Sequence, residues 1–204
     1  MLLGLSTLRD LINLRPAVRP TCTKMLLHYC TSPDKILRSN AILIARRWIS
    51  PDHTILGPII EAHATEMLHK LSGPPPGDDE EEEEGGGAAW EEIDSIRHFE
   101  LFFAITSKKH VLLRELMRFF GKLMPETASV ILAQIEPLVK SMAAAAVTGG
   151  GGSGGGLADV VGAMREFPDG SDMLVRRIVD ILTDGGGDVH TDVVAAVVDI
   201  VEEK

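Results

Sequence analysis

The sequence predicts an all-α protein made of paired antiparallel helices. Apolar residues make up 45% of the 204 residues, but aromatic residues only 4%, so Leu, Ile, Val, Met and Ala must form most of the core. This composition favours helices over a β-sandwich. No run of residues alternates as a strand does, and even the Val-rich segment 193–201 has apolar residues at helical spacing. Helix start signals recur along the whole chain, which is the third observation in favour of helices.

The start signals place the individual helices. Residues 32–34 (Ser-Pro-Asp) read as an N-cap, a proline at the first helical position and an early acid, and residues 50–52 repeat this arrangement. Residues 125–126 (Pro-Glu) open another helix, and residues 191–192 (Thr-Asp) cap the last one. Helices are expected at residues 2–14, 20–31, 34–49, 52–71, 90–105, 108–124, 126–146, 157–166, 171–183 and 191–203.

Three glycine-rich segments separate these helices. Residues 73–87, 149–156 and 185–187 hold 15 of the 20 glycines, and such tracts cannot bury enough apolar area to offset the entropy of ordering them. We expect flexible loops there. The predicted organisation is a first set of repeat-like helices at 1–72, a disordered acidic insert at 73–88, and a helical region at 89–204 that contains the flexible loop 149–156.

The net charge of −10 comes largely from one run of seven acids, Asp78 to Glu84. Without that run the net charge would be −3, so the total charge gives no case for broad nucleic-acid binding. We expect the run to act as a solvating spacer, with binding to a basic partner as the alternative.

Cys22 and Cys30 are the only cysteines, and their separation along one predicted helix is too large for a disulfide. Two isolated thiols are typical of a reducing compartment. Arg9 and Asp10 interrupt the opening Leu-rich stretch, so we expect no secretory signal. No apolar run approaches the ~18 residues that span a bilayer.

An aliphatic–Arg pair recurs at Arg38, Arg114 and Arg176, at spacings of 76 and 62 residues, each time soon after a turn. Small residues, Ala45 and Gly121, follow one turn or more later and would permit close packing. This pattern resembles HEAT-type repeats, whose paired antiparallel helices stack into an α-solenoid. In that family the arginine bonds a polar group of a neighbouring turn, so we expect a structural role, with a partner contact as the alternative.

Basic residues cluster on and around the predicted helix 108–124. Arg114, Arg118 and Lys122 follow i, i+4, i+8 spacing opposite an apolar face, and Glu115 lies between them. An ordinary solvated face is one interpretation, and a site for an acidic partner or a phosphate backbone is the other. The candidate partner-binding residues are Arg114, Arg118, Lys122, Lys108, Lys109, Arg46 and Arg47.

No catalytic set is evident. The chain has no phosphate-binding loop, no nucleophile elbow and no Cys-x-x-Cys pair, so no enzyme activity and no cofactor is expected. His63, Glu66 and His69 contain a Glu-x-x-His spacing found in di-iron bundles, but the second pair and the further glutamates are missing. We therefore expect no metal site.

Three stretches, 102–116, 131–138 and 167–184, resemble in collinear order the C-terminal region of the symplekin family. The first contains Phe102-Phe103-Ala104-Ile105-Thr106-Ser107, the second ends in Ile135-Glu136-Pro137-Leu138, and the third ends in Leu182-Thr183-Asp184. Residues 25–71 are similar to the HEAT-like stretch that precedes that region. The resemblance covers about residues 20–203, and its strength comes from the order of several stretches.

The resemblance implies a nuclear, non-enzymatic scaffold of pre-mRNA cleavage and polyadenylation. Its implied partners are the metallo-β-lactamase endonuclease of the cleavage and polyadenylation specificity factor, the inactive homologue of that endonuclease, and cleavage stimulation factor. RNA contact would be indirect or weak, and no membrane contact is expected. Because the family's helical region normally continues beyond this point, we expect the chain to be a fragment.

Three other interpretations stay open. One is an unrelated HEAT-repeat adaptor in transport or trafficking, which would show the same periodicity. The second is a helical metal-binding protein that uses His63, Glu66 and His69. The third is direct RNA binding through Arg114, Arg118 and Lys122.

Overall fold

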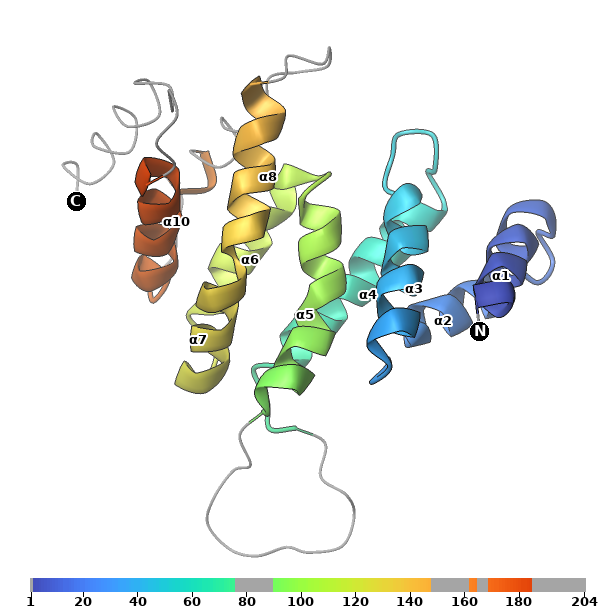
Figure 1. Cartoon of the computed structure of the whole chain (residues 1–204), viewed down its shortest axis with the longest axis horizontal. Coiled ribbons are helices and arrows are strands. Elements are labelled where there is room, and N and C mark those ends of the chain that lie inside the picture. The colour runs from blue at the N-terminus through green and yellow to red at the C-terminus, as the bar shows by residue number, and fades with distance from the viewer. Residues whose placement is uncertain (1, 76–89, 148–161, 165–168, 185–204) are drawn as a thin grey trace, which may run out of the picture. The chain divides into compact units, whose positions relative to one another are not determined.

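The computed structural model describes residues 2–75, 90–147, 162–164 and 169–184, and every regular element in these ranges is a helix (Figure 1). The all-α prediction is thus confirmed for the described part of the chain. The helix predicted at 191–203, most of the one at 157–166, the acidic run and the two later glycine tracts lie outside it. The helices are α1 (Leu2–Leu14), α2 (Arg19–Tyr29), α3 (Lys35–Arg47), α4 (Leu56–Lys70), α5 (Glu92–Thr106), the 3₁₀ turn η1 (His110–Leu112), α6 (Leu113–Phe120), α7 (Pro125–Gln134), α8 (Glu136–Val147) and α10 (Asp172–Asp184).

The chain divides into two compact units, Met1–Ile105 and Thr106–Lys204. The first unit holds α1 to α5, apart from Thr106 at the end of α5, and the second holds η1, α6 to α8 and α10. The insert predicted at 73–88 therefore lies within the range of the first unit. In the first unit α1, α2 and α3 pack against one another, and in the second α8 packs against α7 and α10.

Each unit has an aliphatic core to which buried aromatic rings are added. Phe99 and Phe102 on α5 of the first unit are 2% and 0% exposed, and Phe119 and Phe120 on α6 of the second unit are 5% and 4% exposed. The fully buried aliphatic side chains of the first unit include Ile12, Leu26, Ile60, Leu68 and Leu71. Those of the second unit include Leu113, Leu116, Ile131, Ile135, Val139, Leu174 and Ile178.

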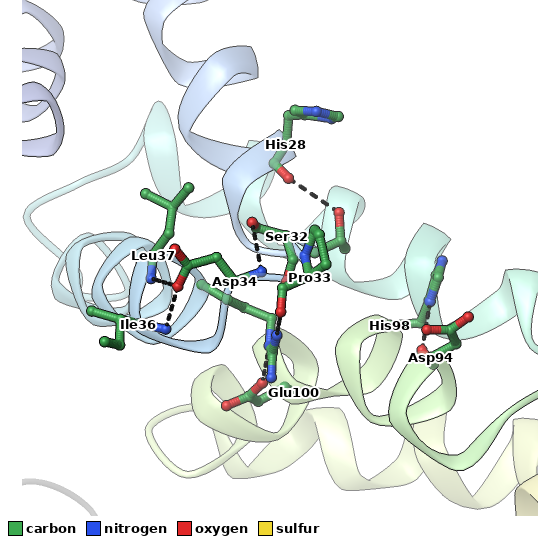
Figure 2. Close-up of polar contacts among 11 residues, drawn as sticks. His28, Ser32, Pro33, Asp34, Ile36, Leu37, Asp94, His98 and Glu100 are labelled. Atoms are coloured by element: carbon green, nitrogen blue, oxygen red, sulfur yellow. Dashed lines mark hydrogen bonds and ion pairs between the residues drawn. The ribbon is translucent and has the colours of Figure 1, made fainter. Parts of the chain in front are cut away.

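The N-cap of α3 is Asp34, not the predicted Ser32. The Asp34 carboxylate accepts from the backbone N–H groups of Ile36 and Leu37 at 2.8 and 3.1 Å (Figure 2). The Ser32 hydroxyl instead accepts from the backbone N–H of Asp34 at 3.2 Å. A carboxylate that meets two unpaired N–H groups at the positive end of the helix dipole is the better cap here.

The similar triplet at 50–52 does not start α4, which was predicted to begin at 52. Residues 50–55 form turns instead, and α4 begins at Leu56 without a side-chain cap. Burial explains the difference, because the buried face of the helix begins at Leu56 and continues through Ile60 and Ala64, spaced four residues apart.

The single helix predicted at 126–146 is two helices. α7 ends at Gln134 and α8 begins at Glu136, with buried Ile135 between them. Pro137 accounts for the break, since it lacks a backbone N–H and its ring would clash with the carbonyl of Ala133. Proline is well tolerated in the first turn of the new helix.

A close backbone contact joins the end of α6 to the turn before α10. A Cβ atom added to Gly121 would lie 2.9 Å from the carbonyl oxygen of Asp169 and 3.3 Å from the Cα of Gly170. Gly170 itself has a φ of 89°, which favours glycine. The small residue expected at Gly121 thus permits a close approach, although to a turn and not to a helix.

The end of α4 and the start of α5 are tied by Trp90. The indole Nε1 of Trp90 donates to the carbonyl of Gly73 at 2.8 Å. The same ring meets the imidazole of His98 edge-on, with ring centroids 4.6 Å apart. The His98 Nδ1 in turn lies 2.8 Å from the carbonyl oxygen of Asp94, one turn earlier on α5 (Figure 2).

Candidate functional site

The basic candidate residues of the second unit do not share one continuous helix. The predicted helix 108–124 is replaced by η1 followed by the two-turn helix α6. Only Arg114 and Arg118 lie on α6, while Lys108 and Lys109 precede η1 and Lys122 lies in the turn after Phe120. The i, i+4, i+8 stripe is therefore a pair on a helix, with lysines in the segments before and after it.

The helix that carries this pair is firmly anchored. Five of its side chains are buried, and they are Leu113, Leu116, Met117, Phe119 and Phe120. Because these residues occupy one side of a short helix, Arg118 and the partly exposed Glu115 are left on the other side.

Arg118 is the more accessible arginine. Its side chain is 61% exposed, and its Nη1 lies 2.9 Å from the Glu115 carboxylate. An exposed i, i+3 pair of this kind stabilises a helix only weakly, because water and salt screen it. An acidic group of a partner can therefore compete with Glu115 for this guanidinium.

Arg114 has a more restricted setting. It is half-buried, and a Cβ atom added to Gly162 would lie 3.3 Å from its Nη2. Its guanidinium therefore packs against the backbone at Gly162 within the same unit. Of the seven candidate residues, Arg46 and Arg47 belong to the first unit, where they lie in the last turn of α3.

The three repeat arginines have different surroundings. Arg38 is 6% exposed, and its Nη1 donates to the carbonyl of Ser32 in the preceding turn at 2.7 Å. Its Nε donates to Oε2 of Glu100 on α5 at 2.6 Å. Arg114 packs on Gly162, and Arg176 is exposed on α10. The common spacing thus corresponds to one buried, one half-buried and one exposed side chain.

The structure adds an ion-pair network that the sequence analysis missed. Glu136, at the start of α8, accepts from Lys140 at 2.6 Å and from Arg177 of α10 at 3.1 Å. The hydrogen bond from Lys140 and its charge lower the pKa of Glu136, with a further contribution from the charge of Arg177. The i, i+4 spacing to Lys140 was readable in the sequence, whereas the contact between α8 and α10 depends on tertiary packing.

The histidine-containing segment of α4 does not gather metal ligands. His63 is half-buried, and burial lowers its pKa, while Glu66 pairs with Lys70 at 3.3 Å. In the ranges that the structure describes, no group of three or more His, Cys, Asp or Glu side chains is placed to hold a metal ion. Within the same ranges, every helix lacks the length and apolar character that a bilayer-spanning segment needs.

A pocket of about 220 Å³ lies in the first unit, where the end of α1 meets the turn before α4. Arg19 lines it, but the Nε of Arg19 donates to the carbonyl of Ile12 at 2.8 Å. The Arg19 guanidinium is thus engaged by a backbone carbonyl that would otherwise be unpaired at the end of α1. The pocket is lined by Ile12, Asn13, Arg19, Asp52, His53, Thr54, Ile55 and Leu56.

Every regular element in the described part of the chain is thus a helix, and the exposed pair of Arg118 and Glu115 lies on α6 of the second unit. No protein-family model, no curated protein and no solved structure matches the chain.

Proposed function

We propose that this chain is a non-enzymatic scaffold of the nuclear pre-mRNA cleavage and polyadenylation machinery, built from HEAT-like antiparallel helical repeats. The observation that carries the proposal is the collinear resemblance of the stretches 102–116, 131–138 and 167–184 to the symplekin family. In support, these stretches fall on helical elements: α5 to α6, α7 to α8, and α10.

The proposed mechanism is the presentation of surfaces by rigidly packed helices. The protein would hold subunits of the cleavage and polyadenylation specificity factor, namely the metallo-β-lactamase endonuclease and its inactive homologue, near cleavage stimulation factor. Arg118 is the first contact residue that we propose, because it is 61% exposed and Glu115 holds it only through a surface ion pair.

The test is affinity purification from nuclear extract with the full chain as bait, read by mass spectrometry. We expect the endonuclease subunits to be retained, and we expect an Arg118→Glu/Lys122→Glu variant to lose them. Both side chains are exposed, so the variant should keep the helical circular dichroism of the parent. Lys24→Glu, at an exposed position of α2, is the matched charge reversal in the first unit.

The outcomes separate the scaffold role from the contact face. Retention of the subunits by the wild type and the variant alike would keep the scaffold and discard Arg118. A well-folded bait that retains none of them would discard the role in polyadenylation, and an unrelated helical-repeat adaptor would replace it. Direct RNA binding would instead show as an affinity that falls steeply with salt.

A further inference from the structure

The solvent-facing stripe of α3 combines apolar and cationic side chains. Ile36 and Leu43 are 71% and 54% exposed, and Arg47 is exposed as well. Together with Asn40, these residues follow i, i+4, i+7, i+11 spacing, so they lie in one line along the helix. We call these four residues the α3 stripe.

The stripe is opposite the buried face of the same helix. Arg38, Ala41, Ile42 and Ala45 form that buried face and hold α3 in the first unit. The side-chain amide of Asn40 donates back to the carbonyl of Ile36 at 2.8 Å. The polar residue at the centre of the stripe is therefore already engaged within its own helix. Single exposed apolar residues are common, but here two of them align on a helix whose orientation is fixed.

The charge around the stripe is uncompensated within the described residues. α3 contains four cations and no acid, in the sequence Lys-Ile-Leu-Arg-Ser-Asn-Ala-Ile-Leu-Ile-Ala-Arg-Arg. The acids that contact this helix are already engaged, because Asp34 caps its N-terminus and Glu100 pairs with Arg38. No described acid pairs with Lys35, Arg46 or Arg47, whereas α4, α5 and α6 each contain an internal ion pair.

Arg46 adds an independent sign of missing partners. The residue is half-buried, and its Nε is buried without a hydrogen-bond acceptor among the described residues. Buried N–H donors are normally satisfied, so this unpaired donor agrees with the shortage of described acceptors around the C-terminal end of α3.

We infer that the α3 stripe is a docking surface for an amphipathic helix that carries acidic residues beside its apolar face. Ile36 and Leu43 are about 10 Å apart along the helix axis, which matches apolar side chains seven residues apart on a second helix. The acidic residues of the partner would pair with Lys35 and Arg47, at opposite ends of α3. This inference rests on the proposed scaffold role. It adds acidic amphipathic helices as a class of partner that the first unit binds.

A protein helix fits this surface better than a nucleic acid or a bilayer does. The stripe has aliphatic side chains and no exposed aromatic ring on which bases could stack. Two apolar side chains in a single line are also a narrow face, whereas helices that lie in a membrane interface carry a broad one.

The test is selection of peptides from a displayed library of proteome-derived segments on the full chain. The selection is repeated on an Ile36→Ser/Leu43→Ser/Arg47→Glu variant, whose substitutions are all at exposed positions and should leave helicity unchanged. We expect peptides enriched only on the wild type to share apolar residues at i, i+3 or i+4, and i+7, flanked by Asp or Glu. Met25→Ser/Lys24→Glu on α2 is the matched control, because both residues are exposed there.

Synthetic versions of the enriched peptides then give affinities by fluorescence anisotropy. We expect Leu43→Ser and Arg47→Glu each to weaken binding at least tenfold, Arg47→Gln to have an intermediate effect, and the α2 control to bind within twofold of the wild type. Replacement of the acids of the peptide by lysine should abolish binding. Failure of the selection, enrichment of basic peptides, or equal binding by the α3 variants would overturn the inference.

Two alternative occupants are tested with the same variants. Self-association that the stripe substitutions abolish would assign the surface to a second copy of the chain, and binding to vesicles of anionic phospholipid would assign it to a membrane. Either result would overturn the inference but leave the proposed function standing, because that proposal is decided by which nuclear subunits the bait retains.

Discussion

Arg38 of α3 and Glu100 of α5 form an ion pair of 2.6 Å although 62 positions separate them in the sequence. The Arg38 side chain is 7% exposed, and that of Glu100 is 33% exposed. The same guanidinium also donates to the carbonyl of Ser32 at 2.7 Å. A single buried side chain thus links a turn, the helix that follows it and a distant helix of the first unit.

Replacement of Arg38 by methionine should destabilise the protein markedly. The apolar stem would still fill the space, but Glu100 and the Ser32 carbonyl would lose their donor. Because Glu100 is partly open to water, we expect a loss of about 2–3 kcal/mol, somewhat below the value for a fully buried pair. Urea unfolding followed by circular dichroism measures it. The exposed Arg47→Met should change the stability by no more than about 0.5 kcal/mol, and similar losses for both variants would contradict this account.

Replacement of Gly121 by alanine should also destabilise the protein. The new Cβ atom would meet the backbone carbonyl of Asp169 at 2.9 Å, so the turn before α10 would have to shift. We expect a loss of about 1–3 kcal/mol, as in other overpacked sites. Gly4→Ala is the control, because nothing lies within 4 Å of its Cβ position inside α1. That change should stabilise by roughly 0.5–1 kcal/mol, since alanine favours helices. Thermal unfolding of both variants tests this difference, because the melting temperature should fall for Gly121→Ala and rise for Gly4→Ala.

The stability should fall as the pH decreases from about 7.5 to 5, because two histidines disfavour protonation in the folded state. Burial lowers the pKa of His98 and that of His63 from 6.5, so the unfolded chain binds more protons in this range. Their contribution is complete above pH 6.5 and decreases as the pH falls toward the lowered pKa values. Free energies of unfolding measured across this range should show a smaller slope for His98→Asn, and a smaller slope still for the His63→Asn/His98→Asn variant. A slope unchanged in both variants would argue against this origin.

The thiol of Cys30 should resist alkylation until the protein unfolds. The residue is 0% exposed, and burial raises the pKa of its thiol to about 12, with a further contribution from the charge of Glu100. Because the thiolate is the reacting species, iodoacetamide at pH 8 should leave Cys30 unmodified in the native state. Peptide mass spectrometry before and after addition of urea makes the comparison. Rapid modification of the native protein would show that the first unit opens near α2.

The regular helices were predictable because their signals are local. Periodic apolar residues and the proline at position 125 placed α1, α2, α3, α7 and α10 within two residues at their starts. Two of the errors occurred where a neighbouring residue competes for a local role. Asp34 displaced Ser32 as the cap, and Pro137 divided the helix predicted at 126–146.

The environments of the arginines could not be predicted, because they depend on contacts between distant residues. Arg38 and Arg176 occupy equivalent positions in the proposed repeat, yet among the described residues only Arg38 of these two meets an acid from another helix, at 2.6 Å. At the α10 position the neighbouring Arg177 is the one that reaches Glu136, at 3.1 Å. Adjacent residues on a helix point in directions about 100° apart. A degenerate repeat does not specify which of two adjacent arginines faces the neighbouring helix.

The hydrogen bond from Trp90 to the carbonyl of Gly73 has a practical consequence for anyone who engineers this protein. It holds residues 73 and 90, which flank the intervening stretch, next to each other. Loop-closure entropy grows only logarithmically, by about 0.6 kcal/mol for each doubling of length. The interval between these two residues is therefore a suitable point for grafting an epitope or a fluorescent domain, with Trp90 itself left intact.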